Sequence, residues 1–227
     1  MRTSIAHVTP YLIAFFVLSL IGCDSEQAPP TSLEGPAKQS ATQQQNEVAD
    51  DNRPKFDPSH PIAKIETSMG DIVIQLDAEK APITVKNFLW YASSGHYDDM
   101  IFHQVIDGYI ALAGGYTVNL IEKPTYFPIH NEAYNRLKNK KYTLAMARVA
   151  DQIDSSTSQF FFNLDDNDQL NHKSRESAED FGYCVFGKVI SGQDVLHRIS
   201  KVTVQDTEKL ASVPVQPIMV KTVTQTD

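Results

Sequence analysis

The sequence has very little cysteine and no excess of positive charge. Its 227 residues include two cysteines, and the formal net charge is −8 at pH 7. Two cysteines are too few for a disulfide framework. An acidic chain without a basic run that is interleaved with aromatics does not attract nucleic acid. The composition therefore excludes a disulfide-stapled small domain and argues against a nucleic-acid partner.

Motifs that hold metals, nucleotides or catalytic serines are also missing. None of the seven histidines stands in His-x-His or His-Glu-x-x-His spacing, and the sequence has no Cys-x-x-Cys pair. It also has no Gly-x-Ser-x-Gly turn and no phosphate-binding loop. We therefore expect no metal site and no cofactor, and neither a nucleotide-dependent enzyme nor a serine hydrolase.

Hydrophobic runs long enough to cross a membrane are absent as well. The apolar run Tyr11–Ile21 (YLIAFFVLSLI) is shorter than the roughly 20 residues that a spanning helix needs. Arg2 precedes it, so residues 1–22 have the layout of a secretory signal peptide. Its end, Leu20-Ile21-Gly22-Cys23, resembles the lipobox of bacterial lipoproteins, which implies cleavage before Cys23 and acylation of that cysteine. An ordinary cleaved signal peptide is the alternative.

Residues 23–58 are expected to be an acylated cysteine followed by a flexible linker. The segment is acidic, rich in Gln, Ser and Pro, and has almost no large apolar side chains, so it cannot offset the entropy of ordering. A flexible chain of ~35 residues spans ~30–35 Å, which would let a domain at 59–227 work at some distance from a bilayer. The alternative is a linker whose length has no role. Asp24 resembles an inner-membrane retention signal, which favours an inner-membrane anchor facing the periplasm.

Residues 59–227 alternate between short strand patterns and two helical patterns. Residues 63–67 and 72–76 alternate apolar and polar side chains about a turn, which predicts a hairpin. A helix is predicted from Pro82 to Gly95, because Pro suits its first position and apolar residues recur at helical spacing. A second helix is predicted at 194–199, and a weakly patterned loop at 118–141. Many short strands with glycine-containing turns favour a mainly β, closed antiparallel barrel capped by two α-helices.

The stretch 100–117, MIFHQVIDGYIALAGGYT, is the most informative part of the chain. Its alternating residues, its Asp107-Gly108 turn signal and its Gly114-Gly115 pair predict strand, turn, strand and a close backbone approach. The stretch resembles the active-site segment of the cyclophilins, the peptidyl-prolyl cis-trans isomerases. Further matches follow in order, including Lys80-Ala81-Pro82, TLAMAR at 143–148, SQFFFN at 158–163 and FGKV at 186–189. The resemblance covers about residues 60–224 and implies an eight-stranded barrel, usually a monomer that binds proline-containing polypeptides.

The resemblance also implies which side chains form the site. The residues implied to bind substrate are Tyr109, Ile110, Leu112, Ala147, Arg148, Gln159, Phe161, Leu170 and Tyr183, while Gln104, His103 and Phe102 are implied for catalysis. Ala147 and Arg148 would act through their backbone, and His103 would have a supporting role. The apolar members could instead be plain barrel core. Gln169 stands where an aromatic usually forms one wall.

Two departures from the family pattern concern the catalytic donor. Cyclophilins carry an arginine where this chain has Gln104 and a glutamine that orients it where this chain has Leu112. A neutral hydrogen bond contributes about 0.5–1.5 kcal/mol, against about 1.5–3 kcal/mol for one to a charged group. We therefore expect a prolyl isomerase of reduced rate that assists protein folding in the cell envelope. The alternative is a binding module, a non-catalytic chaperone or scaffold for proline-containing segments.

Cys184, the second cysteine, lies in Gly182–Phe186 (GYCVF), a pattern typical of a core strand. We expect it to be a buried and unreactive thiol.

Overall fold

The computed structural model describes residues 57–226. The predicted signal peptide, the lipidation site Cys23 and the predicted linker as far as residue 56 lie outside the described residues. Within 57–226, no helix is long and apolar enough to cross a membrane.

Nine short strands form one antiparallel sheet, and two more form a small hairpin. The strands of the large sheet are β1 Ile62–Thr67, β2 Gly70–Leu76, β3 Met100–Ile101, β4 Gln104–Ile106, β5 Ile110–Ala113, β6 Thr143–Met146, β7 Phe160–Asn163, β8 Val185–Ser191 and β11 Met219–Gln225. The hairpin pairs β9 Val204–Gln205 with β10 Val213–Pro214.

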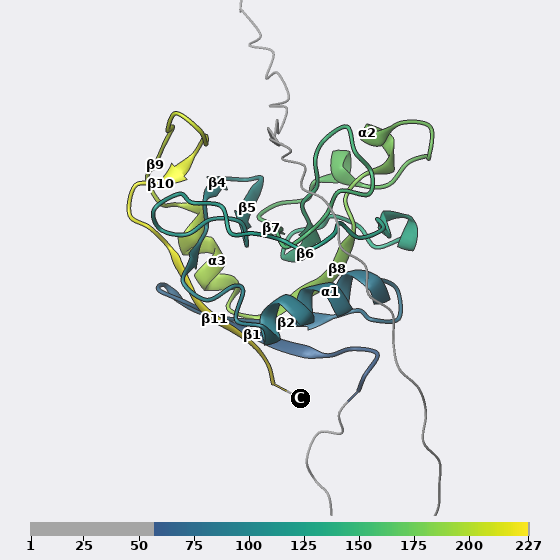
Figure 1. Cartoon of the computed structure of the whole chain (residues 1–227), viewed down its shortest axis with the longest axis horizontal. Helices are drawn as coiled ribbons and strands as arrows, with labels where there is room; N and C mark the ends of the chain where they lie inside the picture. The colour runs from purple at the N-terminus through teal and green to yellow at the C-terminus, as the bar shows by residue number, and fades with distance from the viewer. Residues whose placement is uncertain (1–56, 227) are drawn as a thin grey trace, which may run out of the picture. The chain divides into compact units, whose positions relative to one another are not determined.

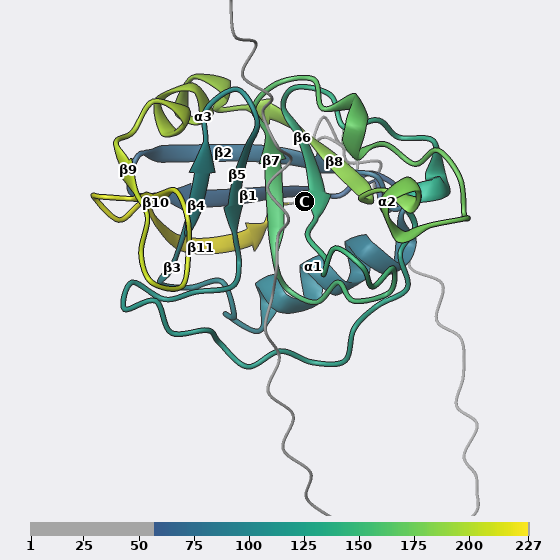
Figure 2. The ribbon, with the colours of Figure 1, turned by 90° about the horizontal axis from the view of Figure 1, so that it is seen from above.

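The large sheet curls into a barrel with strand order β3-β11-β1-β2-β8-β6-β7-β5-β4. Figure 1 shows β1, β2 and β11 on one side of the barrel and β4 to β7 on the other, and Figure 2 shows that the two sets of strands cross steeply. The predicted mainly β barrel is confirmed, but the prediction of full closure overstated it. The end strands β3 and β4 are not paired with each other; they are consecutive in the chain and separated only by Phe102 and His103.

The same interruption explains the strand count. The resemblance implied eight strands, and residues 100–106 alternate without a break, as one strand would. The structure divides them into β3, which pairs with β11, and β4, which pairs with β5. The backbone N–H of Phe102 bonds to Ile218, while that of His103 bonds to Leu112. The chain therefore changes partner between these two residues, and one predicted strand becomes two.

Side-chain alternation gives the barrel two apolar faces. On β7, Phe160 and Phe162 point into the main core, whereas Phe161 belongs to a separate cluster on the outer face. All four residues of β5 and of β7 are buried, so these strands are covered on both faces. A strand covered on both faces reads as a continuous apolar run, as IALA and FFFN do.

Helices close the barrel. The predicted helices are confirmed as α1 Pro82–Ser93 and α3 Gln193–Ser200, and a single extra turn, α2 Ala178–Phe181, was not predicted. Phe88 of α1 lies within 5.4 Å (ring centroids) of Phe160 and 5.3 Å of Phe186, in the centre of the core. The core-strand pattern at Gly182–Phe186 is only partly strand, because α2 ends at Phe181 and β8 Val185–Ser191 begins three residues into the pattern.

The N-terminus of α1 is capped from a distant loop. Its own N-cap residue, Ala81, makes no side-chain hydrogen bond. The buried carboxylate of Glu132 accepts hydrogen bonds from the backbone N–H groups of Ile83 (3.2 Å) and Thr84 (2.8 Å) and from the Thr84 hydroxyl (2.7 Å). Because the first N–H groups of a helix lack intrahelical partners, this loop residue fixes the position of α1.

Candidate active site

The register of the sheet aligns one row of residues across five neighbouring strands. Gln104 of β4 faces Leu112 of β5, and Leu112 faces Phe161 of β7. Phe161 faces Ala145 of β6, which faces Val185 of β8. Directly opposed residues of an antiparallel pair place their side chains on one face, about 4.5–5.5 Å apart. The row therefore runs from a polar amide at Gln104 into an apolar surface.

Around this row the structure gathers a second apolar cluster, distinct from the main core, which we call the outer cluster. Its buried members are Ile110, Leu112, Ala145, Ala147, Phe161, Leu170 and Val185, and the partly buried Tyr109, Leu137 and Tyr183 pack against it. Seven of these ten were implied as substrate-binding residues by the sequence resemblance. Residues from strands and loops far apart in the sequence thus meet on one face, as a socket for a proline ring requires.

Three members of the outer cluster, Ala145, Leu137 and Val185, were not predicted from the sequence. Ala145 and Val185 had a usable signal, because each alternates with neighbours that face the main core, Leu144 and Met146 for the first and Cys184 and Phe186 for the second. Leu137 lies in the weakly patterned loop, where no periodicity points to it.

Two tyrosines border the outer cluster. The ring of Tyr183 meets Phe161 edge-on at a centroid distance of 5.7 Å. Burial is the main cause that raises the pKa of both Tyr109 and Tyr183, so both are neutral phenols at pH 7. A neutral phenol adds apolar surface together with one hydroxyl donor. Gln169, at the position of the expected aromatic wall, is exposed and donates to Asn167 at 3.3 Å.

Gln104 lies at the polar end of the row and is half-buried. Its amide Nε2 donates a hydrogen bond of 3.2 Å to the backbone carbonyl of Ala211. An NH₂ group carries two donors, so one proton is committed to the protein and one is left for a substrate. Opposite it, Leu112 is buried and offers no polar partner.

Arg148 has a structural side chain. It is buried, and its guanidinium donates to the carbonyls of Gly182 (3.0 Å), Val149 (3.0 Å), Ala150 (2.6 Å) and Ala178. It also lies 4.6 Å from the centroid of the Tyr183 ring. The side chain therefore holds Tyr183 and the turn before it, which leaves the backbone of Arg148 as the part implied to contact a peptide.

The predicted clamp residues Ala147 and Gln159 are neighbours. The N–H of Ala147 bonds to the carbonyl of Gln159 at 2.9 Å. The side chain of Gln159 lies over Gly115, where an added Cβ would come within 2.6 Å of its amide carbon. Gly115 is thus the close approach that the glycine pair indicated, and it makes room for the Gln159 amide.

Phe102 and His103 are not part of the outer cluster. Phe102 belongs to the main core, 6.2 Å from Phe162 between ring centroids, and His103 is buried 4.8 Å from the ring of Tyr116. The resemblance implies both residues for catalysis, with a supporting role for His103, and the structure places them at the break between β3 and β4, directly before Gln104. Their backbone hydrogen bonds to Ile218 and Leu112 fix the position at which β4, and with it Gln104, begins.

The burial of His103 has a measurable consequence for stability. Burial is the main cause that lowers its pKa to about 4, against an ordinary value of about 6.5. Between these values the unfolded chain binds a proton at this residue and the folded chain does not, so the free energy of unfolding rises with pH there. It falls as pH drops from about 6.5 to about 4, by up to about 1.4 kcal/mol per pH unit.

We expect His103→Gln to lose this part of the pH dependence, as measured by urea unfolding at steps of pH. Acidic residues contribute equally to both proteins and cancel in the difference. Equal slopes for the two proteins in this window would show that His103 is not neutral in the folded state.

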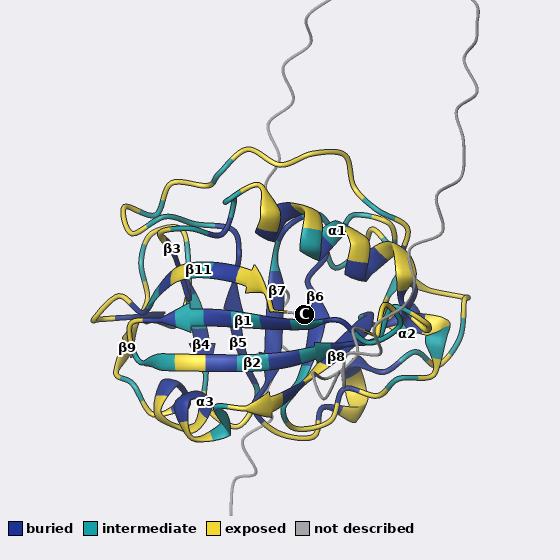
Figure 3. Cartoon of the chain, turned by 90° about the horizontal axis from the view of Figure 1, so that it is seen from below, coloured by how far each residue is buried: buried dark blue, intermediate teal, exposed yellow. Residues whose placement is uncertain are grey.

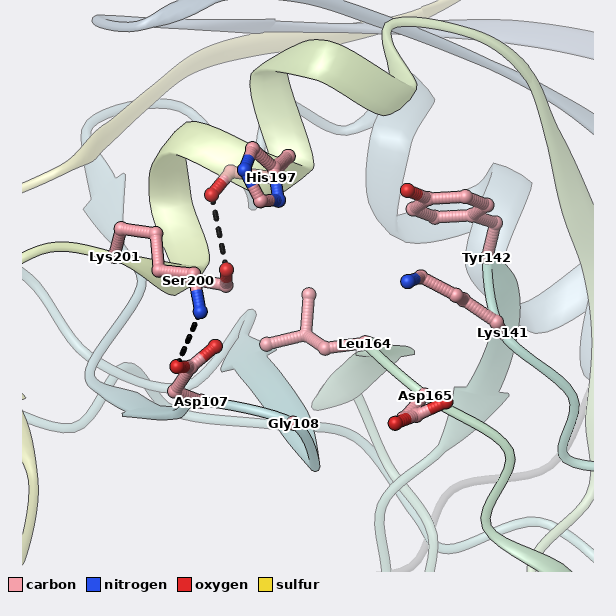
Figure 4. A pocket seen from close by; sticks show the side chains of 9 residues that line it. All are labelled: Asp107, Gly108, Lys141, Tyr142, Leu164, Asp165, His197, Ser200 and Lys201. Atoms are coloured by element: carbon pink, nitrogen blue, oxygen red, sulfur yellow. Dashed lines mark hydrogen bonds and ion pairs between the residues drawn. The ribbon is translucent and has the colours of Figure 1, made fainter.

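A separate cavity of about 230 Å³ lies behind the β4–β5 turn. Figure 4 shows Lys201 directed at Asp107, to which it is paired at 2.5 Å, with Lys141 and Asp165 on the facing side. Four charged side chains line it, so it does not suit an apolar proline ring. The outer cluster is the better candidate.

Comparison with known proteins identifies the family of this chain. Residues 62–225 match the family described as "Cyclophilin type peptidyl-prolyl cis-trans isomerase/CLD". A peptidyl-prolyl cis-trans isomerase of Streptomyces antibioticus is 46% identical over 158 residues, which are 70% of this chain and 94% of the relative. Peptidyl-prolyl cis-trans isomerase B of Escherichia coli is 45% identical over 163 residues, 72% of this chain and 98% of the relative.

Solved structures give the same result. A cyclophilin-type peptidyl-prolyl cis-trans isomerase of Cryptosporidium parvum matches with a TM-score of 0.61 and 26% identity, over 74% of this chain and 98% of that chain. The fold is also that of a cyclophilin from Hirschia baltica, with a TM-score of 0.59, 20% identity and 74% of each chain covered. This chain therefore belongs to the cyclophilin-type peptidyl-prolyl cis-trans isomerases, enzymes that bind proline-containing peptides as substrates.

Proposed function

We propose that this chain is a slow prolyl isomerase that assists the folding of proteins in a bacterial cell envelope, where a lipid on Cys23 anchors it. The observation that carries the reduced rate is the cross-strand pair of Gln104 and Leu112. The family pattern places an arginine and its orienting glutamine at these two positions. Because positions 104 and 112 face each other across the two strands, a chain without the arginine no longer needs the glutamine that orients it.

The chemistry needs a socket and a donor but no nucleophile. Rotation about an X-Pro bond has a barrier of roughly 18–20 kcal/mol, while the two isomers differ by only about 0.5–1 kcal/mol. As amide resonance is lost, the prolyl nitrogen becomes basic, so a hydrogen bond to it is stronger in the transition state than in the ground state. The outer cluster supplies the apolar socket, and Gln104 supplies the donor.

The donor is weaker than a guanidinium. A neutral amide in place of a charged donor stabilises the transition state by ~1–2 kcal/mol less. This difference corresponds to a roughly five- to thirty-fold slower reaction. Gln104 also has one amide proton engaged by Ala211 at 3.2 Å. Only the second proton, or a rotated amide, can serve the prolyl nitrogen.

The second candidate is a binding module that holds proline-containing segments without useful turnover. The apolar outer cluster favours it, because the socket is retained while the charged donor is absent. NMR exchange spectroscopy on a prolyl peptide separates the two candidates. The isomerase accelerates exchange between cis and trans peptide signals, whereas the binding module shifts the signals on titration and leaves the exchange rate at its uncatalysed value.

The location follows from Cys23 and the acidic residue after it. Two or more acyl chains would anchor the protein stably, since a single chain holds only marginally, and Asp24 favours the inner membrane with the domain, as a monomer, in the periplasm. We expect Cys23→Ser to move the protein from the membrane fraction to the soluble fraction of lysed cells. Cys184→Ser is the matched control, because that thiol is buried. Equal fractionation of Cys23→Ser and the unaltered chain would contradict the lipid anchor.

A further inference from the structure

An exposed aromatic face lies on the outer side of α1 and on the loop that follows β5. We define this aromatic face as Trp90 of α1 with Tyr126 and Phe127 of the loop. Phe127 is 90% exposed, Tyr126 64% and Trp90 43%. The rings of Trp90 and Tyr126 meet edge-on at 4.4 Å between centroids. Figure 3 shows the exposed side of α1 beside the exposed loop. Contiguous exposed apolar side chains, unlike singly scattered ones, mark interaction sites.

The loop holds these side chains in a fixed position. The backbone N–H of Tyr126 donates to the hydroxyl of buried Tyr91 at 2.9 Å. Lys123 Nζ donates to the carbonyls of His96 (2.8 Å) and Asp98 (2.7 Å), and the N–H of Ile129 bonds to Ser156 at 2.9 Å. The loop is therefore tied down on both sides of Phe127, and the exposure of that ring is a built feature of the surface.

The aromatic face lies next to the point where the N-terminal segment joins the domain. A shallow apolar depression of about 450 Å³ is lined by Trp90 and Leu89 of α1 and by Pro58 and Pro61. Pro58 lies two residues after the end of the segment outside the described residues, whose proposed anchor point is Cys23. The flexible linker predicted from the sequence, ~35 residues long, would span ~30–35 Å. An anchor at Cys23 would therefore keep its surface within roughly 30–35 Å of Pro58, which lies beside this face.

We propose that the aromatic face docks onto the phospholipid bilayer that carries the lipid anchor. This inference rests on the proposed anchoring at Cys23. Tyr and Trp rings have an apolar body and a polar tip and favour the membrane–water interface, and Phe127 supplies an apolar side chain that the protein leaves in water. The formal net charge of −8 gives no attraction to anionic lipid, so the surface that fits is zwitterionic. The anchor keeps the effective concentration of the domain at the bilayer surface high, on the order of millimolar for a short flexible linker. Weak insertion of the aromatic side chains is then sufficient for docking.

Docking in this way leaves the prolyl site free. The outer cluster lies on the face of β5, β6, β7 and β8 that is turned away from the main core, whereas α1 packs on the main-core side through Phe88 and against β11. Figure 2 shows α1 along one edge of the barrel, with β5 and β7 on the face turned to the viewer. A domain docked through α1 would present the outer cluster along the bilayer surface, where newly translocated polypeptides emerge.

The test uses the chain from Cys23 to Asp227, coupled through the Cys23 thiol to a maleimide lipid in phosphatidylcholine vesicles. Cys184 does not compete, because it is buried and burial raises its pKa to about 12. Trp90 is the single tryptophan of the chain, so its fluorescence reports on this face alone. We expect lipids with brominated acyl chains to quench the fluorescence of Trp90 in the coupled protein. The double substitution Tyr126→Ser with Phe127→Ser should lower the ratio of docked to undocked protein by about tenfold or more, and so reduce the quenching.

Val204→Ser is the matched control, since Val204 is also exposed but lies on the β9–β10 hairpin, and its quenching should equal that of the unaltered chain. Absence of lipid quenching in the coupled protein would overturn the proposal, as would equal quenching in the double variant. Quenching of Trp90 by a brominated client peptide but not by brominated lipid would instead assign this face to protein partners. Because the coupling is chemical, these outcomes do not depend on whether Cys23 is acylated in cells.

Discussion

The double substitution Gln104→Arg with Leu112→Gln should raise kcat/KM for a prolyl peptide roughly five- to thirty-fold, because a charged donor replaces a neutral one. The two positions are cross-strand partners, so the new glutamine can orient the new guanidinium. Peptide affinity should change little, since Leu112 is the one member of the outer cluster that is replaced and the other nine are kept. Exchange NMR gives both the rate and the affinity on the same sample.

The two single substitutions should not add. Leu112 is buried in the outer cluster, so Leu112→Gln alone places an amide in an apolar site at a cost of about 1–3 kcal/mol. Gln104→Arg alone gains the charge but not the residue that orients it. A double-mutant cycle on both stability and rate should therefore show a favourable coupling between the positions.

Gln75→Arg is the charge control for this experiment. It lies on β2, whose neighbours in the sheet are β1 and β8, and adds the same charge away from the donor position. A rate gain from Gln75→Arg would attribute the effect to net charge. No gain from the double substitution would show that the amide of Gln104 is already an adequate donor.

Loss of the distant helix cap should give the largest change in stability. Glu132→Ala removes an acceptor of three hydrogen bonds at the N-terminus of α1 and leaves buried donors without partners. We expect the free energy of unfolding to fall by about 3 kcal/mol, as measured by urea denaturation. Glu132→Gln keeps one acceptor oxygen and should lower the free energy of unfolding by less than Glu132→Ala.

Glu79→Ala is the matched control, since Glu79 is an exposed acid just before the same helix. Its substitution should change stability by less than about 0.5 kcal/mol. If Glu132→Ala and Glu79→Ala were equally mild, the cap would not stabilise α1, and other contacts would fix the helix.

The barrel and most of the outer cluster could be predicted because their information is local. Alternation on IALA and FFFN assigns Ile110, Leu112 and Phe161 to one face once the family pattern supplies the strands. Pro82 and Gly95 likewise bound α1, in agreement with the observed Pro82–Ser93. These signals depend on near neighbours in the chain, which a single sequence displays.

Features that depend on distant partners could not be predicted. Glu132 caps a helix about 48 residues earlier in the chain, and nothing around Glu132 in the sequence indicates that role. The break between β3 and β4 arises because Phe102 and His103 bond to different strands, while their side chains continue an unbroken alternation. The aromatic face likewise appears only when the loop folds beside α1.

The central claim is a cyclophilin with a working socket and a weakened donor, and one measurement tests it most directly. Exchange NMR on a prolyl peptide should be run with the domain of residues 57–227 and with an arginine-bearing relative under the same conditions. The account predicts comparable peptide affinities and an exchange rate for this chain above the uncatalysed value but roughly five- to thirty-fold below that of the relative. Equal rates for the two proteins would contradict it.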